Sequence, residues 1–481
     1  MLRRVVLGLT IAAAVAVPTA VLPRAQATTV LVVRQDGSAD FTAIQDAIDA
    51  ASPGDTVEIA DSATYLENVI VYRNGTGQTL HGLTLRAASG AAPVVDGGWN
   101  GVDPGGGCSG PVEDGSTIKV YQADDVTIEG LEVVNARGGV DQSGVAIMQT
   151  VDRLTLRDNV IHGGRNDGIQ FADVCGVGPY HDIVIEGNEI FGFLDDEISD
   201  GAACIKIHDA IRAVIRANDI HDCQRGIAAY KGATFAMTGG EISTNRIHHI
   251  RHVLANGTAG AGDEGIKLDD GSSGVRIHRN EIWANGDNGI RLDNVIDIAV
   301  THNTVWGNGA PGPLDELNQA GILIHNGSDT SIKVIDNIVT RSTGSGILVA
   351  NADPFDGTSE FDYNNVFDNA GPQYRDADLA QPNRQRIQGG RDRQTPSTFV
   401  SASTLPDADF NLVCGPEVPS AAVDAGIDAG YGEPYEEIAP DIGRRESLCR
   451  GGPDCTPAGI LSVAPAGLIP YAVCLASRDI I

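Results

Sequence analysis

The segment VRIHRNEIWANGDNGIRLDN, Val275–Asn294, contains the two short phrases that decide the fold of this chain. The first, VRIHRNEI, reads apolar-x-apolar-x-x-Asn-x-apolar, and the second, GIRLDN, begins with Gly289. Both alternate apolar and polar residues over four or five positions. This period of two is typical of short β-strands and not of helices.

Both phrases recur along the middle of the chain. The Asn phrase recurs every 23 to 35 residues, with asparagines at Asn159, Asn188, Asn218, Asn245, Asn280, Asn303 and Asn337. The Gly phrase begins at Gly144, Gly168, Gly226, Gly265, Gly289, Gly321 and Gly346, and Cys204 takes the glycine's place in CIKIHD. A repeat this short leaves no room for a helix, so three strands and their turns form one coil. Coils stacked about 4.8 Å apart predict an all-β fold, a parallel β-helix with an aliphatic interior and a buried ladder of asparagines.

The composition narrows the range of partners. The 481 residues include 33 Lys and Arg against 64 Asp and Glu, which gives a formal charge of −31. Such a surface repels the phosphates of DNA and RNA, so we expect no nucleic-acid partner. The 59 glycines indicate many turns, and an aromatic content of only 5% indicates that the core is aliphatic.

The first 27 residues have the features of a signal peptide. Arg3 and Arg4 form a basic start, Val5–Val17 is apolar, and Ala25–Ala27 reads Ala-x-Ala. We therefore expect cleavage after Ala27, a secreted, extracellular protein, and no attachment to the membrane after cleavage. The eight cysteines, an even number, suit an oxidising compartment.

The mature chain is expected to be a monomer with two parts. Residues 28–375 form the β-helix, and residues 376–481 form an irregular C-terminal region that contains disulfides. Four of the cysteines in that region are expected to pair among themselves, in any of three connectivities. They are Cys414, Cys449, Cys455 and Cys474.

The stretch DFTAIQDAIDAA, residues 40–51, predicts a helix that caps the first coil. Phe41, Ile44 and Ile48 lie on one helical stripe and can cover the open end of the stack. Asp40 is predicted to be the N-cap of this helix.

Three segments carry a resemblance to a known superfamily. VVRQDGSADFTAIQDAIDAASPGDTVEI, Val32–Ile59, looks like the opening of the pectate-lyase and pectinesterase superfamily of right-handed parallel β-helix proteins. The repeats resemble that superfamily's coils up to about Phe367, and Pro419–Glu446 is similar to the closing segment of many secreted bacterial β-helix proteins. The later catalytic motifs of pectinesterases and the Gly-His-Gly signature of polygalacturonases are absent from the sequence. The resemblance therefore implies the fold and leaves the activity open.

Aligning the coils on the Gly phrase sorts outward-facing residues into columns. Residues two and four positions after the glycine share one face of a sheet, and column neighbours lie about 4.8 Å apart. The middle of the columns is charged. The predicted patch contains Lys206, His208, Tyr230, Lys267, Asp269, Arg291 and Asp293. We interpret it as a small basic island on an acidic protein, although a solvated face with salt bridges between coils would give the same pattern.

A long groove with a basic island suits a linear acidic polysaccharide, whose uronate groups need to be neutralised. β-Elimination requires a base that removes the proton α to the carboxylate. In the resembled lyases a Lys or Arg is the base, often with Ca²⁺, and that role is assigned here to Lys267 beside Arg291, with Lys206 as the second choice. Arg291 would neutralise the carboxylate, and Tyr230 or His208 would donate to the leaving oxygen.

Two other functions stay open at this point. One is a glycoside hydrolase, for which Asp269 and Asp293 on adjacent coils are the candidate carboxylates. The other is a non-catalytic surface protein that binds glycans. In each case Asp269 and Asp293 are candidate substrate contacts. Trp283 and Trp306 either offer an apolar platform to sugar rings or stack on planar groups of neighbouring coils.

Acidic loops precede the Gly phrase next to this patch. Grouped carboxylates suit Ca²⁺, which takes six to eight oxygen ligands. The candidate ligands are Asp195, Asp196, Asp200, Asp263, Glu264 and Asp270. Solvated loop acids are the alternative, because an acidic chain contains such clusters by chance.

Overall fold

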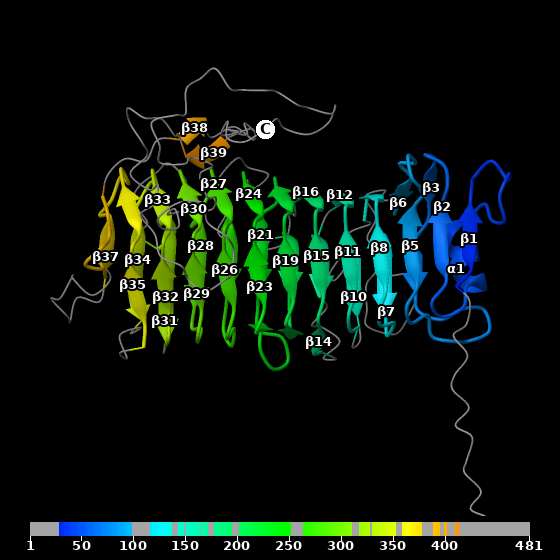
Figure 1. The fold of residues 1–481 in the computed structure, drawn as a ribbon, viewed down its shortest axis with the longest axis horizontal. Helices are drawn as coiled ribbons and strands as arrows, with labels where there is room; N and C mark the ends of the chain where they lie inside the picture. The colour runs from blue at the N-terminus through cyan, green and yellow to red at the C-terminus, as the bar shows by residue number, and fades with distance from the viewer. Residues whose placement is uncertain are drawn as a thin grey trace, which may run out of the picture.

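The chain winds into a β-helix built of three long parallel sheets (Figure 1). The computed structural model describes residues 28–98, 116–136, 143–148, 151–164, 166–171, 178–194, 202–251, 263–309, 317–327, 330–352, 358–377, 388–394, 399–401 and 409–412. The predicted signal peptide and the four C-terminal cysteines lie outside these ranges. No helix within them is long and apolar enough to cross a membrane.

Each coil contributes one strand to each sheet. Sheet A contains β1 (Val30–Val33), β2 (Thr56–Ile59), β5 (Thr84–Ala87), β8 (Thr127–Glu129), β11 (Thr155–Arg157), β15 (Val184–Glu186), β19 (Val214–Arg216), β23 (Glu241–Ser243), β26 (Arg276–His278), β29 (Ala299–Thr301), β32 (Lys333–Ile335) and β35 (Glu360–Asp362). Sheet B contains β3 (Thr64–Leu66), β6 (Val94–Asp96), β9 (Glu132–Val134), β12 (Val160–Gly164), β16 (Glu189–Phe193), β20 (Asp219–His221), β24 (Arg246–His248), β27 (Glu281–Trp283), β30 (Thr304–Trp306), β33 (Ile338–Thr340) and β36 (Asn365–Phe367).

Sheet C carries the Gly phrases. It contains β4 (Val69–Val71), β7 (Ile118–Tyr121), β10 (Ser143–Met148), β13 (Asp167–Phe171), β17 (Ala203–Ile207), β21 (Arg225–Ala229), β25 (Ile266–Leu268), β28 (Ile290–Asp293), β31 (Ile322–Gly327), β34 (Ile347–Ala352) and β37 (Tyr374–Asp376). A small parallel sheet at one corner contains β14 (Tyr180–His181), β18 (Ala210–Ile211) and β22 (Met237–Thr238), and β38 (Phe399–Ser401) pairs antiparallel with β39 (Asp409–Leu412).

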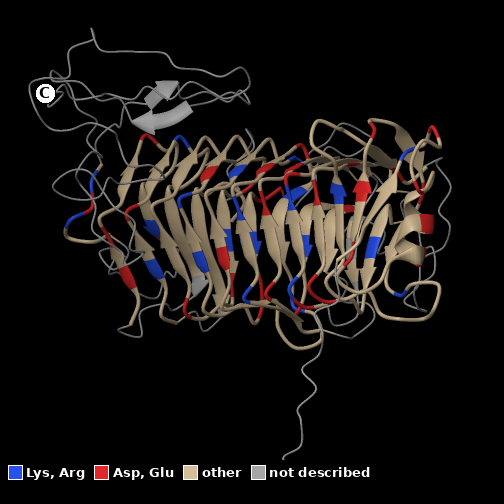
Figure 2. Ribbon diagram, turned by 45° about the vertical axis from the view of Figure 1, so that its right-hand side comes forward, with Lys and Arg blue, Asp and Glu red and all other residues tan. Residues whose placement is uncertain are grey.

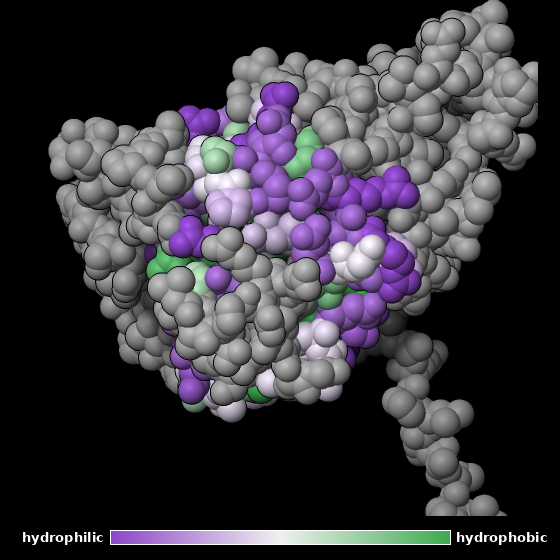
Figure 3. Space-filling model, turned by 90° about the vertical axis from the view of Figure 1, so that its left-hand side faces the viewer, coloured by the Kyte–Doolittle hydropathy of each residue, from purple (hydrophilic) through white to green (hydrophobic). Residues whose placement is uncertain are grey.

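The register of the strands places similar residues of successive coils on top of one another. Ile290 of β28 pairs with Ile266 of the preceding coil and with Ile322 of the following one, and all three are fully buried. The interior is a single continuous cluster made almost entirely of Ile, Val, Leu and Ala. The predicted parallel β-helix with an aliphatic core is confirmed. Figure 3 views the molecule from the β37 end, where the described surface is mainly hydrophilic with small hydrophobic spots.

The N-terminal helix is present, but its cap differs from the prediction. Helix α1 spans Ile44–Ala50 and buries Ile44 and Ile48 against the first coils. Its N-cap position has no side-chain hydrogen bond. The carboxylate of Glu67 instead accepts hydrogen bonds from the backbone N–H groups of Ile44 and Gln45, at 3.0 and 2.9 Å. Asp40 as N-cap is therefore wrong, because an acid from a later coil satisfies the free N–H groups at the helix start.

The predicted asparagine ladder is confirmed in full. The seven asparagines are at most 1% exposed, and Asn364 extends the ladder by one coil. Asn280 shows the pattern: its Oδ1 accepts from the backbone N and Nδ2 of Asn245, both at 3.0 Å. Its Nδ2 donates to the Ile242 carbonyl at 2.9 Å and to Asn303 Oδ1 at 3.0 Å. Each amide therefore satisfies both the turn backbone and the next amide in the stack.

A second, shorter ladder lies next to the glycine of the Gly phrase. Asn285 Nδ2 donates to Asn308 Oδ1 at 3.0 Å. A Cβ atom on Gly265 would lie 2.7 Å from the Gly289 carbonyl oxygen and 2.9 Å from Asn285 Nδ2, so only glycine fits between the next coil and this amide. In the one coil where Cys204 replaces the glycine, Cys204 forms a disulfide with Cys223. Cys223 lies two residues after the last residue of β20, just as Asn285 lies two residues after Trp283, the last residue of β27. The disulfide therefore takes the place of one step of the second ladder.

Candidate functional site

A line of cationic side chains runs along the outer face of sheet C. The register places Lys206 opposite Ala228, Ala228 opposite Lys267, and Lys267 opposite Arg291. The three cationic side chains are 14 to 21% exposed. We call these residues and the polar side chains that contact them the sheet C cluster.

Each cation of the line has a carboxylate partner. The pairs are Lys206 Nζ with Asp167 Oδ2 at 3.6 Å, Lys267 Nζ with Asp269 Oδ2 at 3.2 Å, and Arg291 Nε with Asp293 Oδ2 at 2.7 Å. The prediction of a basic island is therefore wrong in its charge. The cluster is a set of closely packed ion pairs with further acids around it.

Glu264 lies between two arginines from different coils. Its Oε1 is 3.4 Å from Arg291 Nη1 and its Oε2 is 3.8 Å from Arg225 Nε. The side chain is 2% exposed, and Oε2 makes no hydrogen bond with any described residue. Because Arg225 belongs to β21 and Arg291 to β28, the two guanidinium groups reach toward each other across the coil of β25.

Tyr230 lies beneath two of these cations. Lys267 Nζ is 4.9 Å and Arg225 Cζ is 5.7 Å from the centroid of its ring. Its hydroxyl is buried and makes no hydrogen bond with any described residue. Burial, and after it the charges of nearby acids such as Glu264, raise the pKa of Tyr230 against the opposing effect of Arg225. The phenol therefore keeps its proton and can give it up as an acid, but cannot act as a base.

His208 and His325 border the cluster on either side. His208 is 4% exposed, with its ring centroid 6.1 Å from that of Tyr230. His325 Nδ1 lies 2.8 Å from Asp293 Oδ1. Since Arg291 contacts the other oxygen of Asp293, both oxygens of this carboxylate are engaged, and it is poorly placed to attack or protonate a substrate.

Asp287 is a buried acid behind Arg291. It is 4% exposed, and its Oδ1 accepts hydrogen bonds from the backbone N and Nδ2 of Asn288 at 2.7 and 2.8 Å. Burial, followed by the charge of Glu264, raises the pKa of Asp287 to about 8. The site therefore contains a carboxylic acid that holds its proton at neutral pH.

The family described as right handed beta helix region matches residues 112–248 and 181–370, two overlapping matches that together span more than half of the chain. The chain belongs to this family. It is a right-handed parallel β-helix protein.

Several solved structures are similar to the chain at low sequence identity. Pectate lyase Pel9A has a TM-score of 0.54 and 16% identity, with 88% of this chain and 97% of that chain covered. XylC in complex with xylose has a TM-score of 0.47 and 14% identity, covering 72% and 76%. PfbA, a surface adhesin of Streptococcus pneumoniae, has a TM-score of 0.46 and 12% identity, covering 77% and 94%. No curated protein matches the chain. The activity of this β-helix protein must therefore be argued from its own residues.

The predicted calcium ligands do not form one site in the described part of the β-helix. Three of them, Asp195, Asp196 and Asp200, lie outside the described residues. Glu264 contacts arginines, and the exposed Asp270 accepts a hydrogen bond from Asn294 Nδ2 at 2.9 Å. Asp263 is buried near Asp287. Within the described ranges, no group of three or more His, Cys, Asp or Glu side chains has the geometry to hold a metal ion.

The two tryptophans of sheet B are not open to solvent. Trp283 is 0% and Trp306 is 6% exposed, so the prediction of an accessible sugar platform is wrong for this conformation. They continue a stack of planar side chains along one column. Its centroid distances are 4.6 Å for His162–Phe191, 4.9 Å for Phe191–His221, 5.0 Å for His221–His248 and 4.2 Å for His248–Trp283. Because these rings face one another, the alternative interpretation, stacking between coils, is the one the structure has.

Sequence reasoning missed Arg225, Asp167 and Asp287. Arg225 and Asp167 each stand directly before the glycine of their Gly phrase, as Glu264 does. A column drawn one position before the glycine would therefore have found them. Asp287 stands two residues before Gly289, as Asp263 does before Gly265, and its backbone N–H donates to the Asp263 carbonyl at 3.1 Å, so a column two positions before the glycine would have found it.

Proposed function

We propose that this β-helix protein is secreted and cleaves an acidic polysaccharide, a polyuronate, by β-elimination. The observation that carries the proposal is the contact between Lys267, the candidate base, and Tyr230, a protonated phenol with no hydrogen-bond partner among the described residues. A base and a donor side by side, with Arg291 in the same column, are the groups that elimination needs.

In the reaction, Lys267 acts in its neutral form. It takes the proton on the sugar carbon next to the carboxylate. The electron pair of that C–H bond forms a carbon–carbon double bond, and the bond to the glycosidic oxygen breaks. The leaving oxygen takes the proton of Tyr230, with His208 as the second candidate donor. Arg291 stabilises the negative charge that builds up on the carboxylate in the transition state.

The fold supports a polymeric substrate. The sheet C cluster extends over successive coils along the axis of the solenoid, so several sugar units of a linear chain can lie across it. A polyuronate is also the kind of substrate named for the pectate lyase that shares this fold. Ca²⁺ would supply the same stabilisation of the substrate carboxylate as Arg291, although the described residues contain no group of acids with the geometry to hold it.

A hydrolase is the second candidate, and one observation favours it. Asp287 keeps its proton to about pH 8, as the general acid of a glycosidase must. The pair predicted from sequence is less suitable, because Asp269 contacts Lys267 and both oxygens of Asp293 are engaged.

The test is a screen of purified protein against pectate, alginate and glycosaminoglycans, with and without a chelator. β-Elimination leaves an unsaturated sugar that absorbs ultraviolet light, and this is the expected result. New reducing ends without absorbance would support the hydrolase. Retention on an immobilised glycan without any product would support a binding protein and contradict the proposed reaction.

A further inference from the structure

Arg225 and Arg291 approach each other across one coil although their strands are two coils apart. Between them β25 contributes both Lys267 and the residue that meets the two guanidinium groups, Glu264. Coils are spaced about 4.8 Å apart, so two arginines that stood straight out from β21 and β28 would be about 9.6 Å apart. Their contacts with the two oxygens of one carboxylate place a guanidinium group on each side of Glu264, within the coil of Lys267.

The carboxylate of Glu264 holds this arrangement from below. Its side chain is 2% exposed, whereas those of Arg225 and Arg291 are 12% and 18% exposed. The guanidinium groups therefore cover the acid and present their own outer edges to solvent. Two guanidinium groups share one carboxylate, so this trio carries one net positive charge.

The contacts of Glu264 are long for a purely structural ion pair. Its two arginine distances, 3.4 and 3.8 Å, exceed those of a hydrogen-bonded guanidinium–carboxylate pair. The negative charge of Glu264 also contributes to the raised pKa of the adjacent Asp287. A buried acid placed beside another acid costs stability, so an arrangement like this is better explained by a task at the surface.

We propose that Arg225 and Arg291, tied together by Glu264, form the subsite that binds the uronate carboxylate of the sugar being cleaved. The inference rests on the proposed function and adds two residues to it. Arg225 contacts the substrate carboxylate as Arg291 does, and Glu264 is a positioning residue. The planar carboxylate of a uronate fits donors from two guanidinium groups, and its position beside β25 brings the adjacent C–H bond to Lys267.

The experiment compares one polymer in two forms. Pectate or alginate, whichever the wild-type protein cleaves, is assayed beside its methyl ester, which has no charged carboxylate. The wild type is expected to prefer the free acid. Arg225→Gln is expected to raise KM for the free acid about tenfold or more, to lower kcat as well because the negative charge on this carboxylate grows in the transition state, and to leave KM for the ester unchanged. Glu264→Gln is expected to act in the same direction, because the arginines are no longer held together.

The matched control is Arg276→Gln on sheet A, where Arg276 Nη2 lies 3.0 Å from Glu241 Oε2. It removes the same charge and should not change the preference. If Arg225→Gln does not fold, as judged from its melting temperature, Arg225→Lys keeps the charge and loses the planar fork, and should show a smaller change in the same sense.

Three results would overturn the subsite. The preference of Arg225→Gln for the free acid stays at the wild-type level, or Arg276→Gln lowers it equally, or Glu264→Gln lowers KM because this acid competes with the substrate. A wild-type protein that cleaves neither polymer contradicts the proposed function instead. The subsite is then tested by calorimetry with trigalacturonate, and equal affinity for wild type and Arg225→Gln would contradict it.

Discussion

Glutamate and arginine alternate from coil to coil along one outward column of sheet A, whereas like charges meet on sheet C. The sheet A column reads Glu58, Arg86, Glu129, Arg157, Glu186 and Arg216. Its arginines are 39 to 51% exposed, and Arg86 Nη2 lies 2.7 Å from Glu58 Oε2. On sheet C, Lys267 stands next to Arg291, and Glu264 stands near Asp287. Figure 2 shows acidic and basic residues interspersed along the coils.

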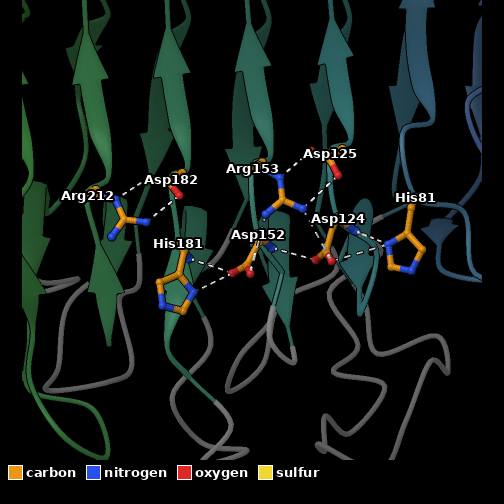
Figure 4. Close-up of polar contacts among 8 residues, drawn as sticks. All are labelled: His81, Asp124, Asp125, Asp152, Arg153, His181, Asp182 and Arg212. Carbon is orange, nitrogen blue, oxygen red and sulfur yellow. Dashed lines mark hydrogen bonds and ion pairs between the residues drawn. The ribbon is translucent and has the colours of Figure 1, made fainter.

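A corner of the solenoid repeats the sheet A arrangement. Figure 4 shows Arg153 paired with Asp125 and Arg212 paired with Asp182, with Nη2 to Oδ2 distances of 2.9 and 2.7 Å. The hydrogen bonds from these arginines lower the pKa of both carboxyl groups. Here the charges are exposed and each meets its opposite, as expected for ladders that fix the register of the coils. The buried and crowded charges of sheet C are not explained by register alone, and we attribute them to function.

The largest effect is expected on the activity of the protein, from a substitution in the sheet C cluster. Lys267→Ala is expected to lower β-elimination by about 10²- to 10⁴-fold, because a general base contributes a factor of this size. Its melting temperature should stay near that of the wild type, since the side chain is outside the core. Absorbance of unsaturated product and thermal melting measure the two quantities. Unchanged activity on the polymer that the wild type cleaves would place the base elsewhere.

A substitution in the asparagine ladder measures how much a buried hydrogen bond inside the coil contributes to the free energy of unfolding. Asn280→Leu leaves buried groups of Asn245 and Asn303 without their partner, at about 1–3 kcal/mol for each group. Chemical denaturation should show this loss in the free energy of unfolding. A variant as stable as the wild type would show that neighbouring amides and water replace the lost contacts.

The pH dependence of stability tests the crowding of acids on sheet C. The carboxyl group of an unfolded Asp titrates near pH 4, whereas Asp287 in the folded protein keeps its proton to about pH 8. Between these values the unfolded chain has released the proton and the folded chain has not, so wild-type stability falls as the pH rises through this window. Asp287→Asn cannot ionise and should therefore melt at a higher temperature than the wild type at pH 8.

The difference for Asp287→Asn should disappear near pH 4, where both states of the wild type hold the proton. The matched control is Asp297→Asn, at an exposed aspartate of the next turn, which should show no such trend. If the melting curves of Asp287→Asn and wild type run parallel from pH 4 to 8, Asp287 is an ordinary ionised acid and sheet C is not strained.

The smallest effect is expected on sheet A. Arg216 Nε lies 2.8 Å from Glu186 Oε2, but the side chain is 51% exposed. Arg216→Ala should cost less than about 1 kcal/mol, the usual contribution of an exposed ion pair, and should leave activity unchanged. Added salt should reduce the cost further. A loss of several kcal/mol would mean that the sheet A ladder contributes to stability as much as a buried network.

The fold could be predicted from the sequence because each repeat contains an asparagine and a glycine that fix its register against the neighbouring coils. The Asn and Gly phrases align the coils, and this alignment placed Lys206, Lys267 and Arg291 in the column that the structure has. The cap of helix α1 could not be predicted in the same way. Glu67 is 23 residues from Ile44, and only the completed coil brings its carboxylate to the helix start.

The ion pairs that balance the charge of the sheet C cluster could not be predicted from the sequence for a similar reason. Asp167 and Glu264 stand before their glycines, where the strand begins, and whether they turn toward the lysines and arginines depends on the bend of the chain there. The columns gave positions on a face and no side-chain directions. Trp283 shows the same limit: the repeat puts it on the outer side of its strand, yet it is fully buried in the structure.

The central claim is that the ion pairs of sheet A serve the fold and those of sheet C serve catalysis. It is tested most directly by swapping charges within one pair of each region, Glu186→Arg with Arg216→Glu and Lys267→Asp with Asp269→Lys, and measuring activity and melting for both. Both proteins are expected to fold, the sheet A swap is expected to keep wild-type activity, and the sheet C swap is expected to abolish it. A sheet C swap that still cleaves the substrate at the wild-type rate would contradict the claim.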